Sequence, residues 1–373
     1  MVKLITTRPK EKALLVGAFR NGESPGSIME LEALAISAGA VVVGQITQKR
    51  SAPDSAFFVG RGKVEEIKAR SEVEDVDVII FDDELSGAQV ANLQELTGVR
   101  TIDRTNLILD IFAQRAKTRE AKAQVELAQL EYLLPRLAGR WSHLERQVGG
   151  IGTRGPGETQ LESDRRQVNK KIEHLKKALK EIDRQRATQH KKRGEVYRIS
   201  LVGYTNAGKS SLFNQLTRSQ AKVENRLFST LDSTTRILKF PYFPKVILTD
   251  TVGFIRKLPH HLVASFRSTL SEVLEADLLL HVVDASRPDC REHIAEVKKI
   301  LVSIDAAQIH EILVPNKIDQ VQGGALPEMG GGFWDIVPVS ALKGTGVLAL
   351  TNKIEAFLKS IAFQQQNGYR LSS

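Results

Sequence analysis

The stretch "YRISLVGYTNAGKSSLFNQL", from Tyr197 to Leu216, decides the fold of the C-terminal half of this 373-residue chain. Its apolar start predicts a strand, its middle matches the pattern GxxxxGKS from Gly203 to Ser210, and its end predicts a helix. A phosphate-binding loop forms in this order, because the glycines let backbone N–H groups wrap around phosphates. Lys209 is then expected to reach the outer phosphates, and the hydroxyl of Ser210 to ligate Mg²⁺.

A second motif lies in "KVILTDTVGF", where a predicted strand ends at Asp250 and Gly253 follows three residues later. The carboxylate of Asp250 can hold Mg²⁺ through a water molecule, and the N–H of Gly253 can sense a terminal phosphate. Many GTPases carry a Gln after this glycine to orient the attacking water, whereas this chain has Phe254. Either a partner orients the water, or another group of this chain does so while Phe254 only packs beneath the switch segment.

Two later strand ends predict which base is bound. "EILVPNKID" ends in Asn316, Lys317 and Asp319, and the Asp319 carboxylate can accept two hydrogen bonds from guanine N1–H and the 2-amino group. Adenine lacks this paired-donor edge. "VPVSALKGTG" ends a strand at Ser340 and Ala341, where a backbone N–H can meet the 6-oxo group of guanine. The four motifs together predict a GTP site.

Between the first two motifs, "FSTLDSTTR" (228–236) predicts a switch segment. Thr230 can ligate Mg²⁺ when a γ-phosphate is present. Thr234 and Thr235 stand close by, and spacing alone does not choose among the three.

The composition, with 42% apolar and 26% charged residues, is typical of a soluble globular protein of two or three domains. No run of 18 apolar residues predicts a transmembrane helix, and the N-terminus does not resemble a secretory signal. Cys290 is the only cysteine, which excludes intrachain disulfides and Cys-rich zinc sites. No partnering base marks it as a catalytic thiol. We expect a cytoplasmic monomer.

Residues 1–103 predict a small α/β domain with a largely parallel sheet. Its "GRGK" (60–63) opens a helix and either holds a phosphate or forms a simple strand–helix turn. The predicted strands are 13–19, 41–46, 56–60 and 76–83, and the predicted helices are 27–39, 62–72 and 86–98.

In residues 104–195 the apolar residues recur at heptad spacing, which predicts an antiparallel helical hairpin. Pro135 falls inside the first helix and is expected to kink or interrupt it. Between the helices lies the glycine-rich segment "GGIGTRGPGETQLE" (149–162). The two apolar seams are Ala123, Leu127, Leu130, Leu134, Leu137, Trp141 and Leu144, and Leu161, Val168, Ile172, Leu175, Leu179 and Ile182.

The positive charge is concentrated in this hairpin. Of a net charge of +9, residues 104–193 carry +10, from 21 Lys and Arg against 11 Asp and Glu. Such a patch attracts polyanions such as RNA, DNA or an anionic membrane, although a solvated helical face gives the same composition.

The whole is an α/β chain: a small N-terminal α/β domain (1–103), a basic hairpin (104–195), a P-loop GTPase domain with a mostly parallel sheet flanked by helices (196–363), and a polar tail (364–373) that is expected to fray.

The chain resembles the HflX family of ribosome-associated GTPases, in the translation-factor-related class of P-loop GTPases. Three features carry the resemblance: the glycine-rich segment with its basic helices, "GYTNAGKSSLFN", and "LFSTLDSTTR" ahead of "LTDTVGFI". The resemblance implies binding to the large ribosomal subunit and GTP hydrolysis that is slow until the ribosome stimulates it. It also places the switch threonine at Thr230. Some family members carry a longer C-terminal domain, so functions that depend on it are in doubt here.

The predicted nucleotide site follows from the motifs and this resemblance. We assign catalysis to Lys209, Thr230 and Gly253, and Mg²⁺ ligation to Ser210 and Thr230, with Asp250 acting through water. The predicted GTP-binding residues are Gly203, Tyr204, Thr205, Asn206, Ala207, Gly208, Lys209, Ser210, Phe228, Ser229, Thr230, Leu231, Asp232, Asp250, Thr251, Val252, Gly253, Asn316, Lys317, Ile318, Asp319, Ser340, Ala341 and Leu342.

K⁺ is a second candidate cofactor. Asn206 resembles the asparagine of potassium-stimulated GTPases, where it helps to hold a monovalent cation beside the phosphates; the alternative is that it only shapes the loop.

The resemblance implies that the hairpin tip inserts against ribosomal RNA near the peptidyl-transferase region. Glycines let the backbone lie close to RNA, and arginines neutralise phosphates. The alternative is that the glycines merely turn the chain. The predicted RNA-binding residues are Gly149, Gly150, Gly152, Arg154, Gly155, Gly157, Arg165, Arg166, Lys170 and Lys171.

We therefore expect a GTPase that docks on the ribosome and splits or rescues stalled ribosomes under stress. The alternatives are a ribosome-assembly GTPase, a GTP-dependent RNA-binding switch without strong hydrolysis, and an RNA remodeller driven by ATP through the N-terminal domain.

Overall fold

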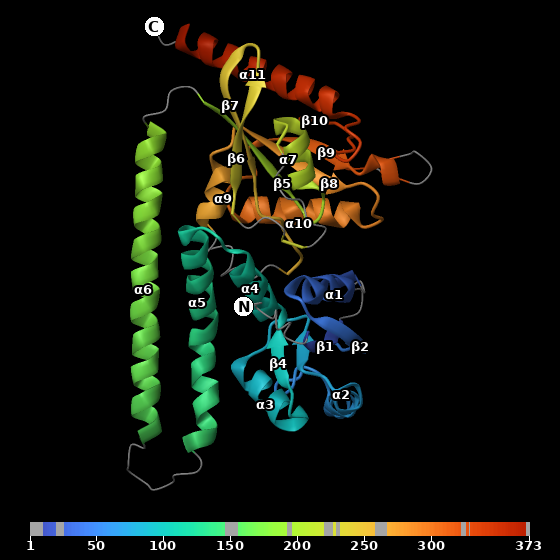
Figure 1. The fold of residues 1–373 in the computed structure, drawn as a ribbon, viewed down its shortest axis with the longest axis vertical. Coiled ribbons are helices and arrows are strands. Elements are labelled where there is room, and N and C mark those ends of the chain that lie inside the picture. Colours follow the sequence, from blue (N-terminus) through green and yellow to red (C-terminus); the bar gives the residue numbers. More distant parts are fainter. Residues whose placement is uncertain are drawn as a thin grey trace, which may run out of the picture. The chain divides into compact units, whose positions relative to one another are not determined.

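The chain forms two compact units, one of Met1–Ile182 with Pro259–Ser265 and the other of Asp183–Leu258 with Phe266–Ser373. The computed structural model describes residues 10–19, 26–145, 156–191, 196–219, 227–228, 232–257, 267–321, 326–327 and 329–370 (Figure 1). We take each unit by itself.

The N-terminal unit contains a four-stranded parallel sheet in the order β2-β1-β3-β4. All four residues of β3 are buried, as expected for a strand that helices cover on both faces. The strands are β1 (Lys12–Phe19), β2 (Val41–Lys49), β3 (Val78–Phe81) and β4 (Arg100–Asp103), and the helices are α1 (Gly26–Ala38), α2 (Arg61–Glu74), α3 (Gly87–Thr97) and α4 (Arg104–Arg115). The small α/β architecture with a parallel sheet is thus confirmed.

Two details of this sheet differ from the sequence expectation. The apolar run 56–60 is no strand, because Asp54 caps the backbone N–H groups of Ala56 and Phe57, and Phe58 turns with φ of 68°. Its apolar side chains still enter the core, where Phe58 and Val59 are buried. Strand β4 was not predicted, since its four residues, "RTID", are too short and too polar to show a pattern.

Helices α5 (Arg119–Glu145) and α6 (Pro156–Lys191) lie side by side in opposite directions, as the predicted hairpin (Figure 1). Leu127, Ile172 and Leu175 are buried between them. Ion pairs also join the two helices, from Lys171 to Glu126 and from Lys176 to Glu131. The remaining contacts are partly buried seam residues: Ala123, Leu130, Leu134, Val168 and Leu179.

Helix α5 continues through Pro135, so of the two effects expected of this residue, a kink or an interruption, the structure contradicts the interruption. The side chains of Tyr132 and Arg136, on either side of the proline, are held by contacts with the N-terminal sheet region, which offset the backbone hydrogen bond that proline cannot make.

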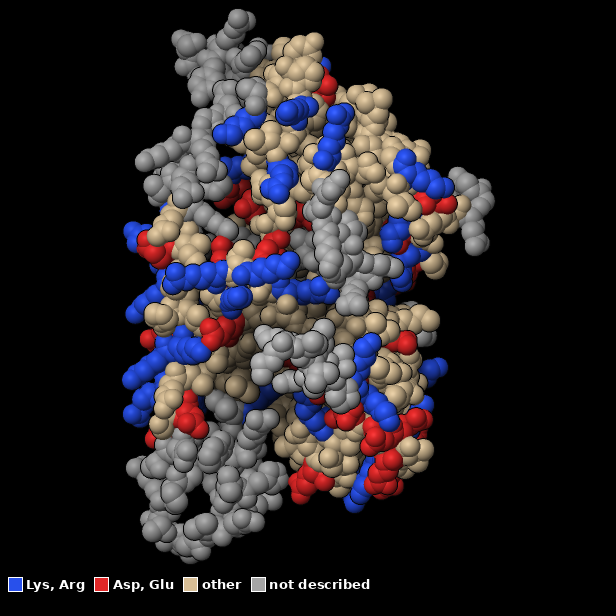
Figure 2. All heavy atoms as spheres, viewed as in Figure 1, with Lys and Arg blue, Asp and Glu red and all other residues tan. Residues whose placement is uncertain are grey.

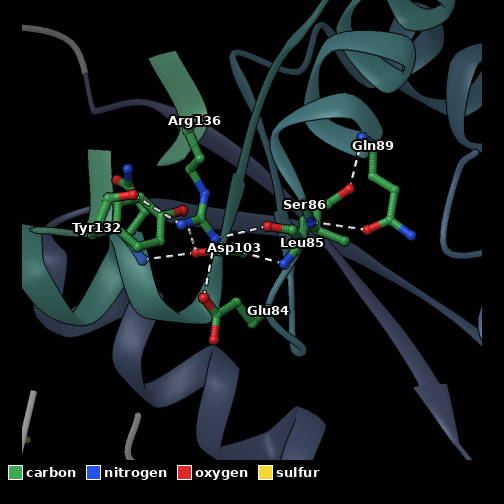
Figure 3. Close-up of polar contacts among 8 residues, drawn as sticks. Glu84, Leu85, Ser86, Gln89, Asp103, Tyr132 and Arg136 are labelled. Carbon is green, nitrogen blue, oxygen red and sulfur yellow. Dashed lines mark hydrogen bonds and ion pairs between the residues drawn. The ribbon is translucent and has the colours of Figure 1, made fainter. Parts of the chain in front are cut away.

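These contacts centre on Asp103, the last residue of β4, which is fully buried (Figure 3). One carboxylate oxygen accepts from the N–H of Asn106, capping α4, and from the hydroxyl of Tyr132 at 2.8 Å. The other accepts from the N–H of Leu85 at 3.0 Å and from Arg136 at 3.3 Å. Burial raises the pKa of Asp103, and these hydrogen bonds oppose the rise.

Arg136 also attaches α5 to the region of the small sheet. Its guanidinium lies 3.6 Å from the centre of the Tyr132 ring and donates to the carbonyl of Leu85 at 2.7 Å. It also reaches Glu84 at 3.1 Å. Together, these contacts fix one face of the hairpin helix to the carboxyl edge of the small sheet.

The C-terminal unit contains a six-stranded sheet in the order β10-β9-β8-β5-β7-β6, parallel except for the β6–β7 hairpin. The mostly parallel, helix-flanked sheet is therefore confirmed. The strands are β5 (Tyr197–Gly203), β6 (Thr234–Phe240), β7 (Phe243–Asp250), β8 (Leu278–Asp284), β9 (His310–Asn316) and β10 (Asp335–Ile336). The helices are α7 (Lys209–Thr217), α9 (Arg267–Leu274), α10 (Cys290–Ser303), η1 (Ile318–Gln320) and α11 (Val347–Arg370).

Helix α11 extends to Arg370, so most of the stretch expected as a frayed tail is helical. The helix is held by Leu350, Ile354, Phe357 and Leu358, which are buried in the core of this unit. Once that apolar face is packed, adding further residues to the helix costs little.

We predict that Arg136→Ala lowers the free energy of unfolding by roughly 2 to 4 kcal/mol, because it leaves the buried Asp103 carboxylate with one cationic partner fewer. The matched change Lys176→Ala removes an exposed ion pair with Glu131 and should cost less than about 1 kcal/mol. Urea denaturation of both variants measures the difference. Equal losses would show that Asp103 does not depend on Arg136.

Candidate nucleotide-binding site

The phosphate loop follows β5 and keeps its shape through two glycines in the left-handed region. Gly203 has φ of 148° and Gly208 has φ of 93°. A Cβ at Gly203 would lie 2.1 Å from the carbonyl oxygen of Val282, and one at Gly208 would lie 2.2 Å from the amide nitrogen of Asn316. Both positions therefore require glycine for space as well as for conformation.

Lys209 begins α7 and is buried in the loop. Its ammonium donates to the carbonyls of Gly203 at 3.0 Å and Tyr204 at 2.8 Å. Burial lowers its pKa to about 8, although the nearby Asp250 carboxylate favours the charged form. A phosphate arriving at this loop would add negative charge beside the amine and favour its protonated form.

Two of the residues predicted to serve Mg²⁺, Ser210 and Asp250, lie together. The Ser210 hydroxyl donates to the Asp250 carboxylate at 2.7 Å, at the carboxyl end of β7. A hydroxyl and a carboxylate are hard oxygen ligands of the kind that Mg²⁺ prefers, so this pair fits the ion that P-loop GTPases use.

Thr230 lies outside the described residues, with Ser229 and Leu231. Of the alternatives, Thr235 shares a hydrogen bond of 3.1 Å with Thr249 in the β6–β7 ladder, and Thr234 lies opposite Asp250. Phe228 is buried, and Asp232 is described at the end of this segment.

The segment after β7 packs closely on the phosphate loop. A Cβ at Gly253 would lie 2.7 Å from Thr205 Cγ2 and 3.0 Å from the Lys209 ammonium. The N–H of Phe254 donates to the Gly203 carbonyl at 3.1 Å, and its carbonyl accepts from the N–H of Thr205 at 2.8 Å. The Phe254 side chain is 1% exposed, so its ring fills the interior.

The base-recognition loops meet at Asn316. Its amide donates to the Ala207 carbonyl and accepts from the Ala341 N–H, both at 2.9 Å. The Ser340 hydroxyl donates to the Asp319 carboxylate at 2.6 Å and, as the largest cause, lowers the pKa of Asp319. The hydrogen bond from Ser340 therefore favours the ionised form of the Asp319 carboxyl.

Sequence reasoning missed Asp284. It ends β8, and its carboxylate accepts from the Lys317 ammonium at 2.7 Å. Its other oxygen accepts from Ser286, through the backbone N–H at 3.1 Å and the hydroxyl at 2.6 Å. The available signal was an acidic residue at the end of an apolar strand, in "HVVDAS". This ion pair holds the side chain of Lys317, a residue whose backbone has a φ of 61°.

The four predicted motifs therefore meet at one edge of the sheet. Thr251 and Val252 are buried beside Gly253, Ile318 binds the Val339 carbonyl through its N–H, and Leu342 is exposed. Elsewhere, Cys290 is buried, and burial raises the pKa of its thiol, which favours the less reactive neutral form. The N–H of Gly60 is bonded to the side chain of Gln48, which favours a simple turn at "GRGK".

The predicted RNA-binding residues fall into two groups. Gly149, Gly150, Gly152, Arg154 and Gly155 lie outside the described residues, and Gly157 is in α6. Arg165, Arg166 and Lys170 are exposed on α6, among Lys and Arg side chains that gather along this helix (Figure 2). Lys171 is also exposed but is paired with Glu126.

Three family models match successive parts of the chain. "GTP-binding GTPase N-terminal" matches residues 26–113, "GTP-binding GTPase Middle Region" matches 115–193, and "50S ribosome-binding GTPase" matches 198–317. In the part of the chain that the structure describes, no helix is both long and apolar enough to cross a membrane.

Similar proteins match most of the chain. The chain is 50% identical to GTPase HflX of Caldanaerobacter subterraneus subsp. tengcongensis, over 84% of this chain and 74% of that protein. It is 49% identical to GTPase HflX of Alkalihalophilus pseudofirmus, over 96% and 85%. A crystal structure of SsGBP with GDP is similar at a TM-score of 0.51 and 27% identity, covering 94% of this chain and 99% of that one. With this similarity along most of its length and a phosphate loop joined to guanine-recognition loops, the chain belongs to the HflX family of GTPases.

Proposed function

We propose that this GTPase docks on the large ribosomal subunit through its basic hairpin, and that its nucleotide state controls the docking. The observation that carries the proposal is the row of exposed cations on α6, at Arg165, Arg166 and Lys170. The apolar seam of the hairpin faces α5, so these side chains are left to meet a polyanion. The description of the matched family model, a 50S ribosome-binding GTPase, supports the same partner. We further propose that docking serves the splitting or rescue of stalled ribosomes under stress.

The nucleotide chemistry follows from the residues at the sheet edge. The Lys209 ammonium turns from the loop carbonyls to the outer phosphate oxygens of GTP and stabilises the charge that develops there. Bound Mg²⁺ would supply further positive charge, held by Ser210 and Thr230, with Asp250 through water. A Cβ at Gly253 would lie 3.0 Å from the Lys209 ammonium, so this backbone is close to the lysine, and we assign its N–H as a donor to the γ-phosphate.

No group in the segment after β7 is assigned to orient the attacking water. The Phe254 ring is buried and has no hydrogen-bonding group. We therefore propose that the ribosome completes the site, either by supplying a group or by moving one into place.

Slow hydrolysis alone and strong stimulation by large subunits are the expected results. Purified protein should turn over GTP below about one per second, the low end of typical enzyme rates. The triple change Arg165→Ala, Arg166→Ala and Lys170→Ala should weaken subunit binding and flatten the slope of log affinity against log salt by about 2 to 3. Lys176→Ala is the matched control, since that cation is paired with Glu131. Phosphate release and subunit cosedimentation measure both; an unchanged salt slope in the triple variant would contradict docking through this face.

Guanine selectivity is expected to depend on Asp319. Asp319→Asn should weaken GTP binding at least about tenfold, because two hydrogen bonds to a charged acceptor are lost. The variant should favour xanthosine triphosphate, whose 2-oxo group can accept from the new amide. Fluorescence titration measures both affinities, with Asp305→Asn on the exposed loop after α10 as the control. Unchanged GTP affinity would show that Asp319 does not recognise the base.

We propose that Asn206, whose side chain is exposed at the phosphate loop, helps to hold a K⁺ ion beside the phosphates. We predict faster hydrolysis in K⁺ than in Na⁺ at equal ionic strength, because the positive charge stabilises the transition state only if the ion fits the site, and Na⁺ is the smaller ion. Asn206→Gly should abolish the difference while tolerating the φ of 62° at this position. Equal rates in the two salts would leave Asn206 with a role in loop shape only.

A further inference from the structure

Tyr204, the second residue of the phosphate loop, is joined to helix α10. Its ring stacks on the ring of His293, with centroids 3.8 Å apart and planes at 12°. Both side chains are buried, at 5% exposure each. Wrapping a phosphate uses backbone N–H groups, so the loop itself does not need an aromatic side chain here.

The phenolic oxygen of Tyr204 bonds to the segment after β7. It accepts a hydrogen bond of 2.7 Å from the backbone N–H of Arg256. The Arg256 side chain in turn pairs with Glu292 and lies 3.8 Å from Asp289, at the start of α10. Asp289 also lies 3.5 Å from His293 Nε2. One stretch of α10 therefore holds both the tyrosine ring and the arginine.

Residues 254–256 are consequently attached to the phosphate loop at three points. Two are the backbone hydrogen bonds of Phe254 with Gly203 and Thr205, and the third is the Tyr204 hydroxyl. Gly253 directly precedes these attachments and has no room for a Cβ against Thr205. Its backbone position is thus set by the attachments that follow it.

We propose that Tyr204 and His293 are positioning residues for GTP hydrolysis: the stacked pair holds the backbone at Arg256 so that the N–H of Gly253 meets the γ-phosphate. This inference rests on the role of Gly253 given under the proposed function. Catalysis by a positioned donor is sensitive to small displacements, because the bond must form in the transition state. GDP has no γ-phosphate, so its binding does not depend on this arrangement.

The test compares GDP, a non-hydrolysable GTP analogue and single-turnover hydrolysis in Tyr204→Phe. This change keeps the stack and removes the acceptor for the Arg256 N–H. We expect hydrolysis at saturating GTP and affinity for the analogue each to fall about tenfold, the value of one hydrogen bond to a buried donor, and GDP affinity to stay unchanged. Tyr242→Phe, at a tyrosine 74% exposed in the β6–β7 hairpin, is the matched control and should behave as the parent protein. Unchanged hydrolysis in Tyr204→Phe, or equal losses for GDP and the analogue, would overturn the proposal.

A second pair of variants covers the case in which Tyr204→Phe does not fold. His293→Phe retains an aromatic partner and should hydrolyse GTP like the parent, whereas His293→Ala removes the stack and should lose rate with GDP affinity retained. If both variants hydrolyse GTP alike, the stack has no positioning role.

Gly253→Ala distinguishes a failure of the positioning role of Tyr204 and His293 from a failure of the role assigned to the Gly253 N–H under the proposed function. If Gly253→Ala leaves the ratio of analogue to GDP affinity unchanged, the assignment of Gly253 fails, and the positioning role fails with it. If Gly253→Ala lowers the ratio and Tyr204→Phe does not, only the positioning role is wrong.

Discussion

The side-chain amide of Asn316 is the contact on which the nucleotide site depends. It is buried, and it joins the phosphate loop at Ala207 to the later loop at Ala341 by one donated and one accepted hydrogen bond. The close approach of this amide leaves no room for a side chain at Gly208. A single polar group therefore sets the spacing between the part that holds phosphate and the part that recognises the base.

In the N-terminal unit, too, one buried side chain joins several elements. Asp103 ends a strand, caps a helix and accepts from Tyr132 and Arg136 of α5. Nearby, the buried Arg104 binds both Asp82 and Glu30. Buried charges of this kind are costly unless every partner is present, so they make the arrangement specific more than they make it stable. The contacts of Asp103 with Tyr132 and Arg136 explain how the long helix α5 is fixed to a small sheet by few contacts.

The segment after β7 supports the proposal that the chemistry is divided between this chain and a partner. Its backbone is bound tightly to the phosphate loop, and the Phe254 ring points into the interior. In the proposed mechanism the chain provides the Gly253 N–H and the buried Lys209, which stabilise charge, while the orientation of water is left to the proposed ribosomal partner. Such a site is suited to a reaction that should wait for docking.

The sequence by itself determined the α/β class of both units, the phosphate loop, the guanine motifs and the hairpin, because each depends on local spacing or on the period of apolar residues. It misjudged residues 56–60, where the Asp54 side chain caps two backbone N–H groups, and it did not predict β4, whose four residues are too short and too polar to show a pattern. Only the tertiary structure decided the partners of Asp103, Asp284, Tyr204 and His293. Each of these side chains bonds or stacks with a residue on another element, and no periodicity along the chain records which elements meet.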